Sequence, residues 1–203
     1  MVRKPYSVGL TIGHQGKGIP YGGRGEPRED GTANYGFKNL KGNPHLLAEV
    51  PELADDSALF QLIDGINRPN TGLVSVGCAA WLYSEDRGHR RAGYVEFAIN
   101  TAEAVADARN YFPLFFKFDR MLHEANFAET VGYNWELDSA NFYPANVDGF
   151  TCSIWIHAAY YPSPEEAKEA WQRALHPLIP FLSNYPLQEG RPLFSVETGE
   201  GSL

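Results

Sequence analysis

The sequence predicts an α+β fold with a mainly antiparallel sheet and helices packed on one face. Segments in which apolar and polar residues alternate, as in half-buried strands, recur along the chain. Segments with helical spacing separate them in the order strand–helix–strand–strand–helix–strand, extended by one more strand and helix. That order is typical of ferredoxin-like (split βαβ) folds, for which an antiparallel sheet covered by helices is the natural packing solution.

Length and composition favour a single domain over residues 1–203. A chain of 203 residues with 43% hydrophobic and 13% aromatic residues can bury a self-sufficient core and is not globally disordered. We expect a long glycine-rich loop inserted at residues 13–42 and a flexible tail at residues 198–203.

The first half of the chain predicts a strand, two short helices and a hairpin. Residues 6–12 alternate as a half-buried strand does. Helical segments follow the glycine-rich loop, one over residues 43–50 and one over residues 55–66, each bounded by proline or turn residues. Leu73–Tyr83 and Ala92–Asn100, joined by a charged tip, indicate an antiparallel hairpin.

The next helix is expected over residues 102–125. Asn100 with Glu103 three residues later has the pattern of a capping box, which opens a helix. Pro113 lies inside the predicted helix, where it removes one backbone donor and is expected to kink it.

Two strands, at residues 130–138 and 150–161, and a last helix complete the prediction. Ser163 is the expected cap of that helix, with Pro164 in its first turn. Residues 193–197 are expected to add a short edge strand. The predicted buried stripe of the last helix comprises Ala167, Ala170, Trp171, Ala174 and Leu175.

The glycine-rich stretch "GHQGKGIPYGGRGEPREDG" (residues 13–31) raises the question of a phosphate-binding loop. It lacks the spacing and the hydroxyl of a P-loop, and Tyr21 stands where a dinucleotide-binding motif requires glycine. Its prolines and glycines also prevent the helix whose N-terminus would face the phosphate. His14 and Lys17, at the end of the first strand, could contact an anionic ligand, but we favour a solvated polar loop.

The charge and the cysteines narrow the range of partners. With 17 basic against 25 acidic residues, the net charge of −8 disfavours nucleic acid and favours a basic protein or a small molecule. No apolar run is long enough for a membrane span, and the N-terminus enters a strand pattern without a signal segment, so we expect a cytoplasmic protein. Cys78 and Cys152 lie in apolar strands and are expected to be buried free thiols. We expect no metal and no cofactor, because no metal-ligand spacing and no nucleophile motif is present.

Alternation divides each strand into a face that packs on the helices and an open face. The side chains predicted to face the helices are Val76, Cys78, Ala80, Val95, Phe97, Ile99, Val131, Tyr133, Trp135, Leu137, Cys152, Ile154 and Ile156. The open face then collects Trp81, Tyr83, Tyr94, Glu96, Glu136, Asp138, Trp155 and His157.

Exposed aromatic side chains among acids have three interpretations. Indoles and phenols anchor protein partners, and acidic neighbours attract a basic one. Alternatively, the glycine-rich loop folds over this face and buries the aromatic side chains as a second small core. In the third, Glu96, Glu136 and His157 form an acid–base set, because carboxylates desolvated beside tryptophan rise in pKa and histidine titrates near neutrality.

Two functional hypotheses follow. The leading one is an acidic cytoplasmic module that binds another protein through this face, as inhibitors and immunity proteins do. The alternative is a small enzyme or small-ligand binder with a site at Glu96, Glu136 and His157, closed by the glycine-rich loop. The sequence favours the non-enzymatic hypothesis and leaves a homo-oligomer open.

Overall fold

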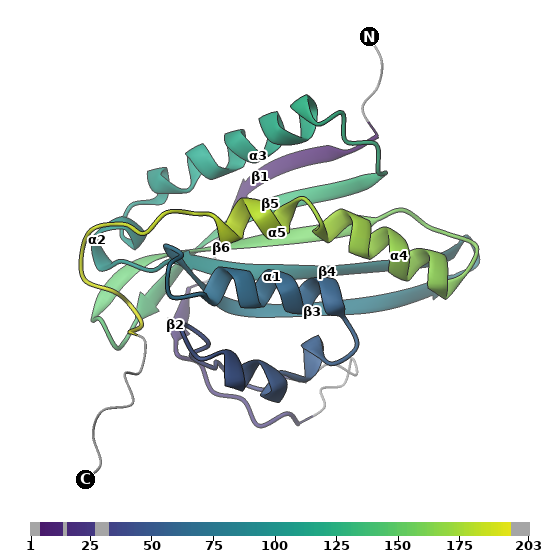
Figure 1. Cartoon of the computed structure of the whole chain (residues 1–203). Helices are drawn as coiled ribbons and strands as arrows, with labels where there is room; N and C mark the ends of the chain where they lie inside the picture. The colour runs from purple at the N-terminus through teal and green to yellow at the C-terminus, as the bar shows by residue number, and fades with distance from the viewer. Residues whose placement is uncertain (1–4, 14–15, 27–32, 196–203) are drawn as a thin grey trace.

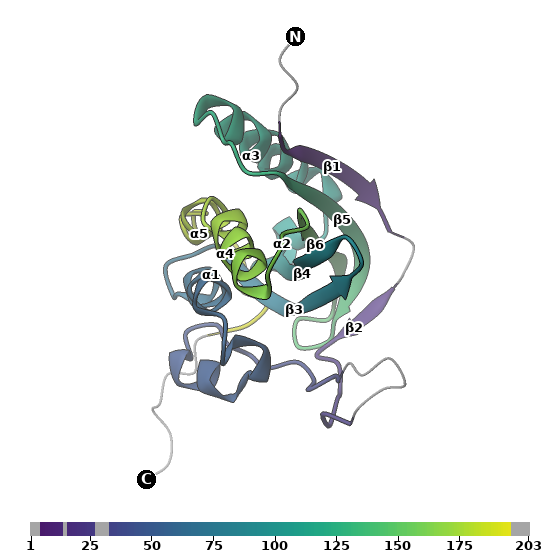
Figure 2. The ribbon, with the colours of Figure 1, turned by 90° about the vertical axis from the view of Figure 1, so that its right-hand side faces the viewer.

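The computed structural model describes residues 5–13, 16–26 and 33–195, and these form a curved sheet with helices along one side (Figures 1 and 2). The strands are β1 (Ser7–Ile12), β2 (Lys17–Ile19), β3 (Leu73–Glu85), β4 (Gly88–Ile99), β5 (Val131–Phe142) and β6 (Val147–Ala158). Their order across the sheet is β1-β5-β6-β4-β3, and β2 pairs with the end of β5 beyond β1. β1 and β2 run parallel to β5, and the other neighbours are antiparallel. The predicted α+β class with a mostly antiparallel sheet is confirmed.

The longer helices cover one side of this sheet. The α-helices are α1 (Ser57–Asn67), α2 (Ala102–Val105), α3 (Phe112–Glu124), α4 (Pro164–Leu175) and α5 (Leu178–Ser183). Short 3₁₀ helices are η1 (Pro44–Glu49), η2 (Pro51–Leu53) and η3 (Ala108–Asn110). Figure 2 shows α1, α3, α4 and α5 on the same side of the sheet, which leaves the other side as the open face.

The main core lies between the sheet and these helices. Alternate residues of β4, β5 and β6, including Phe97, Trp135 and Ile154, are fully buried, as the alternation predicts. Phe118 of α3 and Trp171 of α4 pack against them. The predicted stripe of the last helix is buried, and the Ser163 hydroxyl accepts the backbone N–H of Glu166 at 3.2 Å, so the predicted cap is confirmed.

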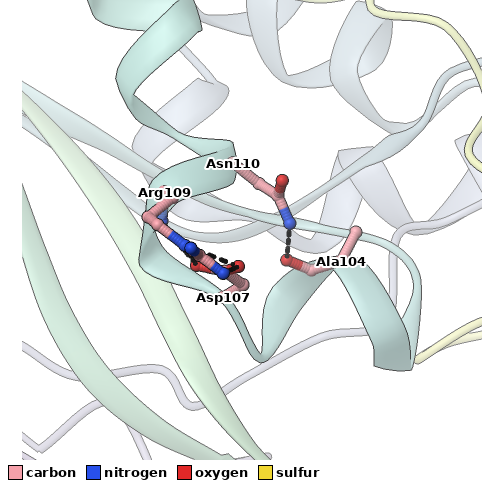
Figure 3. Close-up of polar contacts among 4 residues, drawn as sticks. All are labelled: Ala104, Asp107, Arg109 and Asn110. Carbon is pink, nitrogen blue, oxygen red and sulfur yellow. Dashed lines mark hydrogen bonds and ion pairs between the residues drawn. The ribbon is translucent and has the colours of Figure 1, made fainter.

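The prediction of one helix over residues 102–125 is wrong, because the chain forms α2, η3 and α3 in turn. The Asp107 carboxylate accepts the backbone N–H of Arg109 at 2.9 Å and pairs with its guanidinium (Figure 3). The side chain of Asn110 donates to the Ala104 carbonyl at 2.8 Å, so side chains occupy groups that a continuous helix would pair internally. Pro113 therefore lies in the first turn of α3, where its missing N–H costs nothing, and does not kink a helix.

The capping box expected at Asn100 is also absent. Thr101 is the residue that precedes α2, and the Asn100 amide instead pairs with both backbone groups of Phe194, at 3.1 and 3.0 Å. The chain near Phe194 forms no strand up to residue 195, only an isolated bridge between Thr101 and Pro192. The remainder of the expected edge strand and the predicted tail lie outside the described residues.

A bulge in β3 changes which of its residues face the helices. The pairing with β4 shifts by one residue between Ser75 and Gly77, with Val76 as the extra residue. Leu73 therefore faces the main core before the bulge, while Cys78 packs against it afterwards. Val76, predicted for the main core, instead belongs to a second buried cluster, with Ile19, Val74, Ala98, Phe142 and Phe194.

This second cluster covers one end of the open face. Tyr21 and Phe37, from the glycine-rich segment, pack against it, and their rings contact each other edge to face. Part of the segment therefore buries apolar residues on this face. In one interpretation of the sequence, the glycine-rich loop buries Trp81, Tyr94 and Trp155 in a second small core. These three side chains do not belong to this cluster.

Candidate functional site: a hollow on the open face

Strand register places the predicted open-face residues in adjacent rows. Ser153 of β6 lies opposite Glu96 of β4 on one side and Glu136 of β5 on the other. One row along, Trp155 lies between Tyr94 and Asn134. The two carboxylates are thus two strand spacings apart, about 10 Å between their Cα atoms.

A hollow of about 940 Å³ lies between these rows and described parts of the chain between β2 and η2. Its floor is the open face of β3, β4, β5 and β6, and its walls come from residues 17–21, 33–40 and 50–52. The predicted residues that line it are Lys17, Trp81, Tyr94, Glu96, Glu136, Asp138 and Trp155.

Three aromatic rings form a continuous row in the hollow. The ring centroids of Trp81 and Tyr94 are 6.1 Å apart, and those of Tyr94 and Trp155 are 4.9 Å apart. Both pairs are tilted and lie within the range of favourable ring contacts. All three side chains are half-buried, so each ring keeps a surface that a ligand can contact.

Two carboxylates of the hollow, Glu96 and Glu136, are held by fixed donors. Lys17 Nζ lies 2.6 Å from Glu96 Oε1, and only 7% of the Glu96 side chain is exposed. The indole N–H of Trp155 donates to Glu136 Oε2 at 2.9 Å. Asp138 is buried directly beside Gly13, where a Cβ atom would collide with its carboxylate.

The hollow is negatively charged overall. Four carboxylates line it, and two lysines oppose them. The acidic residues are Glu52, Glu96, Glu136 and Asp138, and the lysines are Lys17 and Lys38. Because low-dielectric walls focus the field of such a cleft, it attracts cations.

Tyr21 is a residue of the site that sequence reasoning missed. Its hydroxyl donates to the carbonyl of Val76, in the bulge of β3, at 2.9 Å. Burial, with the nearby Tyr94 and Glu96, raises the pKa of Tyr21 far above its ordinary value, so the phenol stays protonated. The sequence showed only that Tyr21 breaks a dinucleotide motif, and the bulge that supplies its acceptor has no local signature. Glu52 and Lys38 were missed because η2 and the preceding segment approach the sheet only in the folded chain.

His157 and Tyr83 share the open face but do not line the hollow. His157 is exposed and lies four residues along β6 from Ser153, about 13 Å away. Partial desolvation of the imidazole by its neighbours, together with the nearby Arg90, lowers the pKa of His157, which favours the neutral imidazole. The structure thus brings Glu96 and Glu136 to the hollow and leaves His157 apart from them. His14 lies outside the described residues.

Both cysteines of the chain are free thiols. Burial raises the pKa of Cys78 to about 12 and that of Cys152 well above its ordinary value, so neither is poised as a thiolate. Within residues 5–13, 16–26 and 33–195, no three His, Cys, Asp or Glu side chains are grouped as metal ligands would be.

Comparisons with protein-family models, with curated proteins and with solved structures found no match for this chain. Among the helices of the described segments, none is long and apolar enough to cross a membrane.

Proposed function

We propose that this chain is a protein-binding module of the inhibitor or immunity type, which accepts a cationic side chain of a basic partner protein in the hollow. The observation that supports the proposal is the row formed by Trp81, Tyr94 and Trp155, which lies beside carboxylates in one concave site. Aromatic residues at the centre of a recessed surface are typical binding hot spots.

The chemistry of the hollow suits lysine or arginine. A cation over an aromatic face gains about 0.5–2 kcal/mol, the larger values being reached when it is desolvated. Carboxylates add charge-assisted hydrogen bonds. Lys17 illustrates the match, because the chain's own ammonium group lies 2.6 Å from Glu96 Oε1.

Binding suits the site better than acid–base catalysis. Glu96 and Glu136 already accept hydrogen bonds from Lys17 and Trp155, and His157 lies outside the hollow. A small cationic ligand is the second candidate, because the volume of about 940 Å³ falls within the range of small-molecule sites. An enzyme that acts on such a ligand remains the alternative within this second candidate.

The test is affinity capture from the host lysate with wild type, Glu136→Lys and the control Glu165→Lys. Glu165 is exposed on α4, on the other side of the sheet, so the control makes the same charge change away from the hollow. We expect wild type and control to retain one stoichiometric basic protein that Glu136→Lys, although folded, does not retain. Retention by all three baits, or by none, would contradict the proposal.

The second candidate is tested in the same preparations with arginine amide as a small cationic probe. Trp155 lies in the hollow, so occupation there should change the tryptophan fluorescence of wild type and Glu165→Lys but not of Glu136→Lys. A saturable change without any captured protein would favour a small-ligand binder.

We keep three predictions from the sequence as part of this proposal. They are that the chain is a single domain, that its elements follow the ferredoxin-like order, and that the protein is cytoplasmic. The acidic charge of −8 supports a basic partner.

A further inference from the structure

Arg90 of β4 lies on the open face, outside the hollow but only two residues along β4 from Ala92, which pairs with Trp81 of the hollow. Arg90 itself pairs in register with Tyr83 of β3 and lies six positions before Glu96, about 20 Å along the strand. Its guanidinium carbon is 5.1 Å from the ring centroid of Tyr83 and 5.0 Å from that of Tyr160. Two aromatic rings from different segments therefore hold this side chain in place.

Arg90 has no carboxylate partner among the described residues, unlike most arginines of this part of the chain. Ion pairs to aspartate or glutamate are formed by Arg68, Arg87, Arg91, Arg109 and Arg173. The Nε atom of Arg90 is buried and has no hydrogen-bond partner. A buried donor without an acceptor costs free energy, and because Arg90 as a whole is only half-buried, the rest of its side chain stays open to a ligand.

Glu85, which interacts electrostatically with Arg90, does not fill this role. The two carboxylate oxygens of Glu85 accept from Tyr160 at 2.6 Å and from Arg87 at 3.0 Å. The hydrogen bond to Glu85 holds the Tyr160 side chain in place, and Arg87 stacks on its ring, with the guanidinium carbon 4.0 Å from the ring centroid. Glu85 therefore helps to position the Tyr160 ring beside Arg90 and forms no ion pair with the guanidinium of Arg90.

We propose that Arg90, held between Tyr83 and Tyr160, is a binding site for a carboxylate. The planar guanidinium fork matches a carboxylate through two parallel hydrogen bonds, and the aromatic walls reduce the conformational entropy that binding costs. The negative charge of Glu85 nearby opposes a doubly charged phosphate more than a singly charged carboxylate. The carboxylate belongs either to a free small molecule or to an acidic side chain of a protein.

This site is separate from the hollow and does not depend on the proposed function. Because both lie on one face, a protein that used them together would present a basic and an acidic group about 20 Å apart.

The experiment follows the Nε–Hε resonances of ¹⁵N-labelled arginine side chains in the wild-type chain during titration with sodium acetate. Acetamide is the neutral control ligand, and Arg120, exposed on α3 without a carboxylate partner in the described chain, is the internal control. We expect a saturable shift at Arg90 with acetate, no such shift with acetamide, and only a small linear drift at Arg120. Equal linear drift at both arginines would overturn the proposal.

A second arm distinguishes the sources of the carboxylate. A blocked tripeptide with a central glutamate and its glutamine counterpart are titrated in the same way. If the glutamate peptide binds at least about tenfold tighter than acetate, the carboxylate comes from an acidic segment of a protein. If the two bind equally, it comes from a small molecule.

The variant Arg90→Lys keeps the positive charge but removes the planar guanidinium with its two parallel N–H donors. The ring resonances of Tyr83 and Tyr160 then report on acetate, and we expect binding about tenfold weaker than in wild type. Unchanged affinity would overturn the role of Arg90.

Discussion

Lys41 is a lysine that the fold buries among carbonyl oxygens. Only 2% of it is exposed, and its ammonium group donates to the carbonyls of Arg68, Thr71 and Leu73 at 2.6–2.8 Å. These bonds tie the end of the glycine-rich segment to the start of β3. Burial lowers the pKa of Lys41 from 10.5 to about 8, because desolvation disfavours the charged form.

A pH-dependent contribution to stability follows from this shift. Between pH 8 and 10.5 the unfolded chain holds the Lys41 proton and the folded chain releases it, so stability rises with pH in this window and is lost as pH falls through 8. We predict that the advantage of wild type over Lys41→Met in free energy of unfolding grows from about pH 7 to about pH 10. Urea denaturation of both proteins measures it, and tyrosines and cysteines common to both cancel in the difference. If the difference in free energy of unfolding between wild type and Lys41→Met stays constant or shrinks as pH rises, the pH dependence of stability does not come from Lys41.

At the scale of elements, Asp56 joins a helix, a second helix and a strand. Its carboxylate caps α1 through the backbone N–H of Leu59 at 3.0 Å. It also accepts the indole N–H of Trp171 in α4 at 2.6 Å and pairs with Arg91 of β4 at 3.0 Å. Asp56 is 1% exposed, so its removal leaves these donors buried without an acceptor.

We predict that Asp56→Ala lowers the free energy of unfolding by about 3–5 kcal/mol, as expected when one partner of a buried ion pair is lost. The matched control is Asp107→Ala, because Asp107 also caps a helical turn but its contacts to Arg109 are exposed (Figure 3). The control should lose about 1 kcal/mol or less. Chemical denaturation of both variants checks the contrast, and losses of similar size would argue that the buried network adds nothing to the cap.

At the scale of the whole molecule, the two thiols report on opening of the interface between sheet and helices. Cys152 is fully buried, and Cys78, though only partly buried as a residue, packs against the same core. Because burial raises the pKa of Cys78 to about 12, Cys78 holds far less thiolate at neutral pH than an exposed cysteine.

We predict that a disulfide reagent modifies both thiols slowly in the folded protein and rapidly in urea, with Cys152 the slower in the folded state. Spectrophotometric release of the reagent's thiol, with mass spectrometry to assign the site, measures each rate. Rapid modification of Cys78 without denaturant would mean that the edge strand β3 opens locally.

The sequence determined the alternation of the strands, because side-chain direction with a period of two is a local property of extended backbone. For this reason Tyr94, Glu96, Glu136 and Trp155 were predicted on one face, and the register places them in adjacent rows of it. The Ser163 cap was predictable on the same ground, because its acceptor and donor are three residues apart.

Only the tertiary structure decided which parts of the chain meet. The pairing of Lys17 with Glu96 joins residues 79 positions apart. The bulge at Val76 presents its carbonyl to Tyr21, 55 positions away. The break between α2 and α3, by contrast, is held by local contacts among Asp107, Arg109 and Asn110. The hollow and the walls around Arg90 likewise need segments that only packing brings together, since long-range contacts are fixed by the total burial of the core and leave no periodic trace in the sequence.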